Sequence, residues 1–233
     1  MKLYSGGRQA VAGISQGPGH HGDPCPVCER GVPARFCSLG ERRYLRCPVC
    51  EATLLHPACR LPPEDERAVY ELHDNQPDDP GYRSFLARLT EPLTARLPVG
   101  AHGLDFGCGP GPALARMMEE AGMAMCLYDP FFYPSESALS ASYDFVTCTE
   151  VIEHLYHPAS VFRQLSALLK PGGWLGVMTC FQTDDARFEH WHYRRDPTHV
   201  VFYREATLAH IANRLGWSLE VPRKDVALFR KGG

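Results

Sequence analysis

The 233-residue chain lacks the features that would assign it to a membrane, a secretory pathway or a nucleic-acid partner. No apolar run approaches the about 20 residues that a membrane-spanning helix needs, so we expect no membrane partner. The N-terminus carries Lys2 but no continuous apolar segment, which argues against a signal peptide. The formal net charge is only −3, so no general attraction toward nucleic acid or an anionic membrane is expected.

The chain also lacks the cysteine pattern of a small disulfide-bonded secreted protein. Of its ten cysteines, four stand in two close pairs. Four others stand singly in or beside apolar runs, as buried free thiols do: Cys108, Cys126, Cys148 and Cys180. This usage is typical of a reducing compartment, so we expect a cytoplasmic protein. The sequence does not determine the oligomeric state.

The first 24 residues have no apolar periodicity. They are rich in Gly, Ser, Gln and Pro, and we expect residues 1–24 to form a disordered tail. The adjacent His20 and His21 could bind a metal, but a solvated tail is the simpler interpretation.

Two Cys-Pro-Val-Cys segments then predict a metal site. The first segment contains Cys25 and Cys28, the second contains Cys47 and Cys50, and 18 residues separate the two segments. Two such pairs can direct four thiolates at one point, which is typical of structural Zn²⁺. We therefore expect residues 25–60 to form a zinc-ribbon-like module whose folding depends on the metal. A redox role for the Cys-x-x-Cys pairs is a minor alternative, and either His56 or Cys59 could replace one ligand.

The ribbon segment has a local charge of +3. Its basic residues are Arg30, Arg35, Arg42, Arg43, Arg46 and Arg60. They could contact RNA, although a solvated surface is the simpler interpretation. Residues 61–98 then predict a helical cap or linker. Its expected helices are 64–72, with acidic residues in its first turn, and 81–97.

A glycine-rich turn organises the rest of the chain. An expected strand, 101–106, leads into Gly107, Gly109 and Gly111 and then into an expected helix, 112–121. Such a turn lets a ligand approach the backbone and the unpaired N–H groups of the helix start. The spacing differs from the dinucleotide G-x-G-x-x-G pattern, and Asp105 would repel a pyrophosphate but attract an ammonium group.

The next expected strand, 123–128, ends at Asp129, 18 residues past Gly111. An acid at this place can accept hydrogen bonds from both hydroxyls of a ribose. Only 14 residues separate Asp129 from Asp144, so we expect a shortened or missing third strand and helix. Phe131 and Phe132 could form an adenine wall or simply pack in the core.

Two motifs together resemble the class I S-adenosylmethionine (SAM)-dependent methyltransferases. One is the D-x-G-x-G-x-G turn, and the other is Y-D-F-V-x-x-x-E-V-I-E-H-L at 143–155. The second motif consists of an expected strand, 143–148, and a following helix. It is similar to the corresponding segment of small methyltransferases, including ones that act on quinone precursors. The resemblance spans residues 99–230 and implies SAM as cofactor. The cofactor-binding residues we expect are Asp105, Gly107, Cys108, Gly109, Gly111, Asp129, Pro130, Phe131, Thr149 and Glu150. Candidate pocket residues in the cap are Tyr70, His73, Asn75 and Tyr82.

The remaining segments complete the predicted fold. We expect a helix at 158–170, a strand at 174–180, a helix at 204–215 and a hairpin at 217–221 and 226–230. The fold class is thus α/β: a Rossmann-like doubly wound sheet in residues 99–233, with a C-terminal antiparallel hairpin, plus the small zinc ribbon. A loop at 181–203, rich in aromatic and histidine residues, should lie at the ligand-binding end of the sheet and form the acceptor-side wall.

The predicted activity is methyl transfer from SAM to an oxygen, nitrogen or carbon atom of a small molecule. An oxygen or nitrogen acceptor can need a base. The candidates are His154, His192, His199 and Tyr193, although His154 could equally be a structural hydrogen bonder. One alternative is an RNA methyltransferase that contacts RNA through the ribbon. A second is a SAM-binding or interaction module without turnover.

Overall fold

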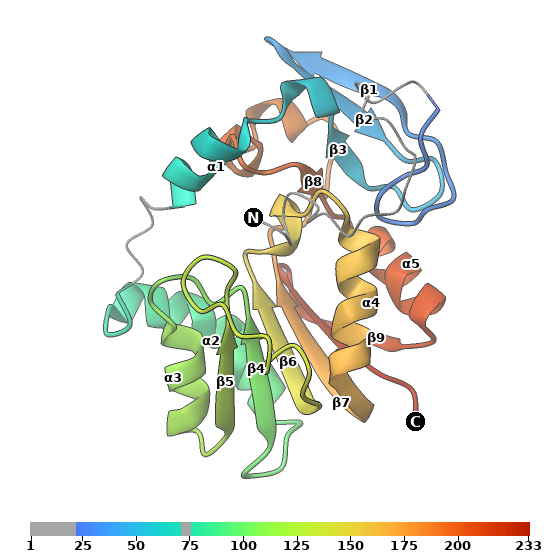
Figure 1. Cartoon of the computed structure of the whole chain (residues 1–233). Helices are drawn as coiled ribbons and strands as arrows, with labels where there is room; N and C mark the ends of the chain where they lie inside the picture. The colour runs from blue at the N-terminus through green and yellow to red at the C-terminus, as the bar shows by residue number, and fades with distance from the viewer. Residues whose placement is uncertain (1–21, 71–75) are drawn as a thin grey trace.

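The computed structural model in Figure 1 describes residues 22–70 and 76–233. The predicted tail therefore falls outside the described residues up to position 21, and so do His20 and His21. The described part forms two sheets, a larger one and a smaller one that lies at one end of it (Figure 1).

The larger sheet has six strands in the order β5-β4-β6-β7-β10-β9. Its strands are β4 (His102–Phe106), β5 (Ala124–Tyr128), β6 (Tyr143–Thr149), β7 (Leu169–Met178), β9 (Ser218–Arg223) and β10 (Val226–Arg230). The first four in the order pair in parallel, and β10 is antiparallel to both β7 and β9. The predicted doubly wound sheet with a C-terminal antiparallel hairpin is confirmed.

Helices cover both faces of this sheet because its strands alternate apolar side chains between the faces. Phe145 packs with α2 (Pro80–Thr94) and α3 (Ala113–Glu120). Its neighbour Val146 belongs to the cluster that includes α4 (Pro158–Leu168) and α5 (Glu205–Leu215). Gly103 on β4 makes room for Phe145, because a Cβ there would lie 2.1 Å from the ring Cζ atom.

The sheet lacks a third strand on the β5 side, as predicted. Residues 129–142 are all described, and they contain no helix or strand apart from one isolated bridge, Asp129 to Tyr133. The chain therefore passes from β5 to β6 without forming a further strand or helix in between.

Two expected elements differ from the prediction. The strand expected at 174–180 begins earlier, at Leu169, and ends at Met178: Leu169 pairs with Tyr143, and the register then shifts so that Trp174 pairs with Phe145. The expected helix after β6 is only a short 3-10 helix, Ile152–His154, because Glu150 has a left-handed φ of 50° that cannot continue into an α-helix.

The smaller sheet is the predicted ribbon with one addition. It contains β1 (Ala34–Leu39), β2 (Arg42–Arg46) and β3 (Thr53–Leu55), and its fourth strand is β8 (Val201–Phe202) from the far end of the chain. Predicting 181–203 as a loop was therefore incomplete: it contains 3-10 helices Phe188–His190 and His192–Arg195 and then joins the ribbon. Two residues of strand are too short to show a period in the sequence.

The ribbon and the larger sheet share one apolar core. Cys25, Tyr44 and Leu54 lie in the same buried cluster as Phe202 and Val146. The helix α1 (Pro63–Tyr70) follows the ribbon. No helix within residues 22–70 or 76–233 combines the length and apolar character that crossing a bilayer requires.

Candidate functional site

A cavity of about 440 Å³ lies at the carboxyl ends of β4, β5 and β6. One part of its wall comes from the glycine-rich turn and the residues after β5. The other comes from the turn after β6 and the 3-10 helix His192–Arg195. Its lining includes Asp105, Gly107, Cys108, Gly109, Gly111, Asp129, Phe131, Phe132, Thr149, Glu150, His154, His192, Tyr193, Asp196, His199 and Tyr82.

The glycine-rich turn has the conformation that its composition predicts. Gly107 and Gly109 have φ values of 78° and 65°, which only glycine adopts without strain. The amides of Gly107 and Cys108 donate to the carbonyl of Tyr128, which ties the turn to the end of β5. The first residues of α3 then line the cavity, with helix-start N–H groups that have no intrahelical acceptor.

Asp105 is a buried carboxyl group in the wall of the cavity. Burial raises its pKa to about 7, a hydrogen bond from the Thr147 hydroxyl opposes this rise, and the nearby charge of Asp129 adds to it. The Thr147 oxygen lies 2.8 Å from the Asp105 carboxylate. A bound cationic group would favour the ionised form of Asp105 and would be attracted by it.

Asp129 organises the turn as well as facing the cavity. One carboxylate oxygen accepts from the Gly109 amide at 3.1 Å. The other accepts from the amides of Phe131 and Phe132 at 2.8 and 3.1 Å. A carboxylate has about four lone-pair positions, so one remains for a hydroxyl donor. The turn role and the proposed ligand role are therefore compatible.

Strained backbone marks the floor of the cavity. Glu150 is one of three non-glycine residues with positive φ in the described part of the chain, and the other two, Glu29 and Glu51, each follow a cysteine pair. Such strain persists only where the surroundings enforce it, and it clusters at functional sites. Next to Glu150, the Thr149 hydroxyl oxygen is buried without a hydrogen-bond partner in the described structure, which leaves it available to a ligand.

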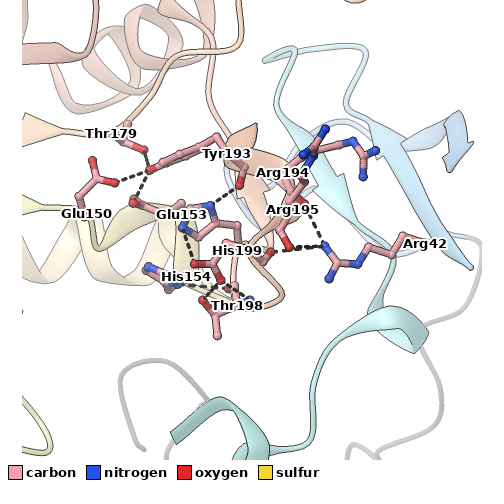
Figure 2. Close-up of polar contacts among 11 residues, drawn as sticks. Arg42, Glu150, Glu153, His154, Thr179, Tyr193, Arg194, Arg195, Thr198 and His199 are labelled. Carbon is pink, nitrogen blue, oxygen red and sulfur yellow. Dashed lines mark hydrogen bonds and ion pairs between the residues drawn. The ribbon is translucent and has the colours of Figure 1, made fainter. Parts of the chain in front are cut away.

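A buried hydroxyl joins two carboxyl groups on the acceptor side (Figure 2). The Tyr193 hydroxyl lies 3.1 Å from Glu150, forms a very short contact with Glu153 and lies 3.0 Å from the Thr179 hydroxyl. Burial raises the pKa of Glu150 to about 7, and burial together with Glu150 raises that of Glu153 well above its ordinary value. The Tyr193 hydroxyl thus links two carboxyl groups that burial shifts toward their protonated forms.

Two buried histidines of the cavity lining each donate from Nδ1 to a backbone carbonyl. The Nδ1 of His199 lies 2.7 Å from the Tyr193 carbonyl, and that of His154 lies 3.2 Å from the Thr198 carbonyl. Because a carbonyl only accepts, each Nδ1 must carry a proton, and in a neutral ring Nε2 then carries the lone pair. The Nε2 of His199 lies 3.9 Å from the Asp196 carboxylate. Ligand atoms of Glu153, His154 and His199 lie within 4.8 Å of one another, so the three could hold a metal ion.

A known family of methyltransferase domains matches residues 80–220 of the chain, which include all the residues of this cavity. The chain belongs to the methyltransferase-domain family.

Curated relatives match shorter stretches of this chain. The ubiquinone biosynthesis O-methyltransferase of Xanthomonas axonopodis pv. citri is 33% identical over 121 residues, which cover 41% of this chain and 50% of the relative. That of Sodalis glossinidius is 39% identical over 72 residues, or 30% of this chain and 28% of the relative. The chain therefore spans half or less of the length of these relatives.

Solved structures with similarity to the chain include one from Burkholderia thailandensis. It is 1,6-didemethyltoxoflavin-N1-methyltransferase with bound 1,6-didemethyltoxoflavin and S-adenosylhomocysteine. It is 15% identical with a TM-score of 0.46, and the match covers 86% of this chain and 100% of that one.

The cavity contains most of the site residues predicted from the sequence. All the predicted cofactor residues line it except Pro130. The four candidate bases also line it; His192 is exposed, and the other three are buried. Tyr82 is the described cap residue that reaches it, since His73 and Asn75 and the Tyr70 side chain lie outside the described residues. Asp196 was missed, because the D-P-T-H segment gives no periodic signal.

The four ribbon cysteines lie together, away from this cavity. Their sulfurs are within 4.8 Å of one another, so they could hold a metal ion. The sulfur of Cys25 lies 3.7 Å from that of Cys50, and the sulfur of Cys28 lies 3.5 Å from that of Cys47. These contacts join the two pairs, whereas a redox Cys-x-x-Cys would bring sulfurs together within a pair. The two alternative ligands have other roles: His56 accepts from the Ala58 amide, and Cys59 donates to the Glu41 carbonyl.

Proposed function

We propose that the protein transfers a methyl group from SAM to a hydroxyl oxygen of a small aromatic molecule. The observation that carries this proposal is the single cavity with two unlike walls. One wall holds buried acids and glycine backbone; the other holds histidines, a tyrosine and two further carboxyl groups, Glu150 and Asp196. The names of the related ubiquinone biosynthesis O-methyltransferases support an oxygen acceptor.

The residues of the first wall fit the parts of SAM. Asp105 would attract the ammonium group, Asp129 would accept from the ribose, and the rings of Phe131 and Phe132 would cover the adenine. Thr149 supplies a buried hydroxyl oxygen that has no hydrogen-bond partner in the described structure. When bound, SAM would supply an electrophilic methyl group on a sulfonium. The protein's own contribution is to align an acceptor with it, which can lower the barrier by several kcal/mol.

The residues of the second wall fit the removal of a proton from the acceptor hydroxyl. Either His154 or His199 could accept that proton at Nε2, because its Nδ1 proton is already held by a carbonyl. Alternatively, Glu153, His154 and His199 could hold a divalent cation that lowers the hydroxyl pKa. The second oxygen of Glu153 is buried with no partner in the described residues, as a cation ligand would be before binding.

We propose further that Cys25, Cys28, Cys47 and Cys50 hold a structural Zn²⁺. Zinc–sulfur bonds of about 2.3 Å in a tetrahedron place the sulfurs about 3.8 Å apart. The observed separations of 3.5 and 3.7 Å fit this geometry without rearrangement. Four thiolates complete the coordination sphere, so this zinc would not act in catalysis.

RNA recognition by the ribbon is less well supported. Two of the three arginines on β2 that would contact RNA are engaged within the protein. Arg42 donates to backbone carbonyls, and Arg46 pairs with Asp185 at 2.7 Å. We therefore keep the small-molecule acceptor as the proposal.

A transfer assay with labelled methyl groups tests the acceptor class. Purified protein would be incubated with [methyl-³H]SAM and a small-molecule, an RNA or a protein fraction of a bacterial extract, with 3,4-dihydroxybenzoate as a defined catechol probe. We expect label in the small-molecule fraction. Label confined to RNA or protein would refute the proposal. Repeating the assay with added Mg²⁺ or Zn²⁺ distinguishes the two mechanisms. Faster transfer with the added ion would favour a bound cation, and an unchanged rate would favour a histidine base.

A further inference from the structure

We propose that Arg42 of the ribbon is a positioning residue for the acceptor wall, so that the ribbon braces His154 and His199. This inference rests on the proposed function for its activity readout. It assigns the N-terminal module a part in the chemistry of a cavity that its own residues do not line.

Arg42 holds the segment that carries the acceptor-side residues (Figure 2). Its Nη1 atom lies 2.9, 3.3 and 3.4 Å from the carbonyl oxygens of Arg194, Arg195 and Asp196. These carbonyls are at the carboxyl end of the 3-10 helix His192–Arg195, where helix carbonyls have no intrahelical donor. A guanidinium is suited to this place because it presents several fixed donors and a permanent charge.

The neighbouring carbonyls of the same segment orient the two histidines. The Tyr193 carbonyl accepts from His199, and the Thr198 carbonyl accepts from His154. Asp196 closes the turn between them by accepting from the Thr198 amide at 2.8 Å. A shift of the 194–196 backbone would therefore move both imidazole rings relative to the cavity.

A second connection runs through Val200. Its carbonyl accepts from the amide of Leu55 on β3, and its own amide donates to the carbonyl of Glu153, both at 2.8 Å. One residue thus links the ribbon to the turn that carries the third member of the Glu153, His154 and His199 cluster. The first connection leads to His154 and His199 and the second to Glu153, so together they reach all three members of the cluster.

Other ribbon contacts reach residues 185 and 188, which precede the 194–196 backbone, and serve as a comparison. Arg46 pairs with Asp185 and stacks on Phe36, with 4.3 Å from the guanidinium carbon to the ring centre. Tyr44 packs edge-on against Phe188, with ring centres 4.9 Å apart. These contacts attach the ribbon to residues 185 and 188 and involve none of the 194–196 carbonyls that Arg42 binds.

The test compares Arg42→Ala and Arg42→Lys with Arg43→Ala, which removes the same charge from an exposed position on the same strand. A small misplacement of catalytic groups can slow a reaction strongly, so we expect Arg42→Ala to lower kcat by about 10- to 100-fold. The Kd for SAM and the zinc content should stay within about twofold of the wild type. Arg43→Ala should leave all three unchanged.

Nuclear magnetic resonance of ¹⁵N-labelled histidines gives a readout that needs no acceptor. We expect Arg42→Ala to shift or broaden the Nδ1–H signals of His154 and His199, which His154→Gln and His199→Gln assign. Histidines away from the segment should be unaffected. If the wild type methylates nothing, the proposed function fails while this measurement still decides the positioning role.

Two results would overturn the inference. One is a kcat for Arg42→Ala equal to that of Arg43→Ala; the other is unchanged histidine signals. If Arg42→Ala does not fold, Arg42→Lys decides, because a lysine keeps the charge but lacks the planar fork. We then expect a loss of kcat of about threefold or more with SAM binding intact, and an unchanged kcat would overturn the inference.

Discussion

The carboxylate of Asp105 and the hydroxyl of Thr147 form a buried hydrogen bond of 2.8 Å between the neighbouring strands β4 and β6. Burial raises the pKa of Asp105 to about 7, and this bond opposes the rise. The pair sets the charge on one wall of the cavity near neutral pH. It therefore leads to a prediction about how SAM binding depends on pH.

SAM should bind more tightly as the pH rises toward 7.5. Below a pKa of about 7, Asp105 is protonated in the free protein, and binding an ammonium group beside it requires release of that proton. By linkage, Kd should rise by up to about tenfold per pH unit below 7. Calorimetry in two buffers of different ionisation enthalpy measures both Kd and the released proton. A Kd that is constant between pH 5.5 and 7.5 would contradict this role for Asp105.

Replacing Thr147 with valine should weaken SAM binding at pH 7. The change removes the hydrogen bond that holds the Asp105 pKa down, so a larger fraction of the carboxyl groups is protonated. We expect Kd to increase by about three- to tenfold at pH 7 and less at pH 7.5. Thr179→Val is the matched control, since it removes a buried hydroxyl from the acceptor wall. Equal effects of the two variants on Kd would argue against the prediction.

Tyr193→Phe should lower methyl transfer without affecting SAM binding. Phenylalanine keeps the ring that packs 4.2 Å from His199 but removes the hydroxyl between Glu150 and Glu153. We expect kcat to fall by about 10- to 100-fold, the range of a group that supports proton transfer. Tyr143→Phe is the control, because its buried hydroxyl bonds the Ala138 carbonyl and does not line the cavity. A similar loss of kcat in both would indicate a general stability effect.

The purified protein should contain about one zinc ion per chain, measured by mass spectrometry. Cys47→Ser should reduce the zinc content and lower Tm, because the binding free energy of a structural zinc contributes directly to folding. Cys37→Ser, outside the four-cysteine cluster, should do neither. A zinc-free protein with an ordered ribbon would show that the cluster is not a zinc site.

Much of the larger sheet could be predicted from the sequence because its signals are local. Alternating or continuous apolar runs predicted the strands, and Gly107 and Gly109 predicted the turn. The interval between Asp129 and Asp144 predicted the missing third strand, since a full crossover needs more residues. In each case the sequence signal lies in the same segment as the structure that it predicts.

The features that could not be predicted depend on contacts between distant segments. The pairing of β8 with β3 joins residues separated by about 150 positions, and its two residues have no period of their own. Glu150 has a left-handed backbone only because its surroundings enforce it, so the helix expected at Glu153 and His154 became a short 3-10 turn. The carbonyl partners of Arg42 likewise have no sequence signal.

The most direct test of the central claim is calorimetric titration of SAM into the wild type, Asp129→Ala and Asp144→Ala. Asp144 is the control because it pairs with Lys170 at the opposite end of β6 and is absent from the cavity lining. We expect one SAM per chain for the wild type and Asp144→Ala, and a Kd raised by about tenfold or more for Asp129→Ala, which loses a charge-assisted acceptor. No heat of binding in the wild type, or no change in Asp129→Ala, would contradict a SAM site in this cavity.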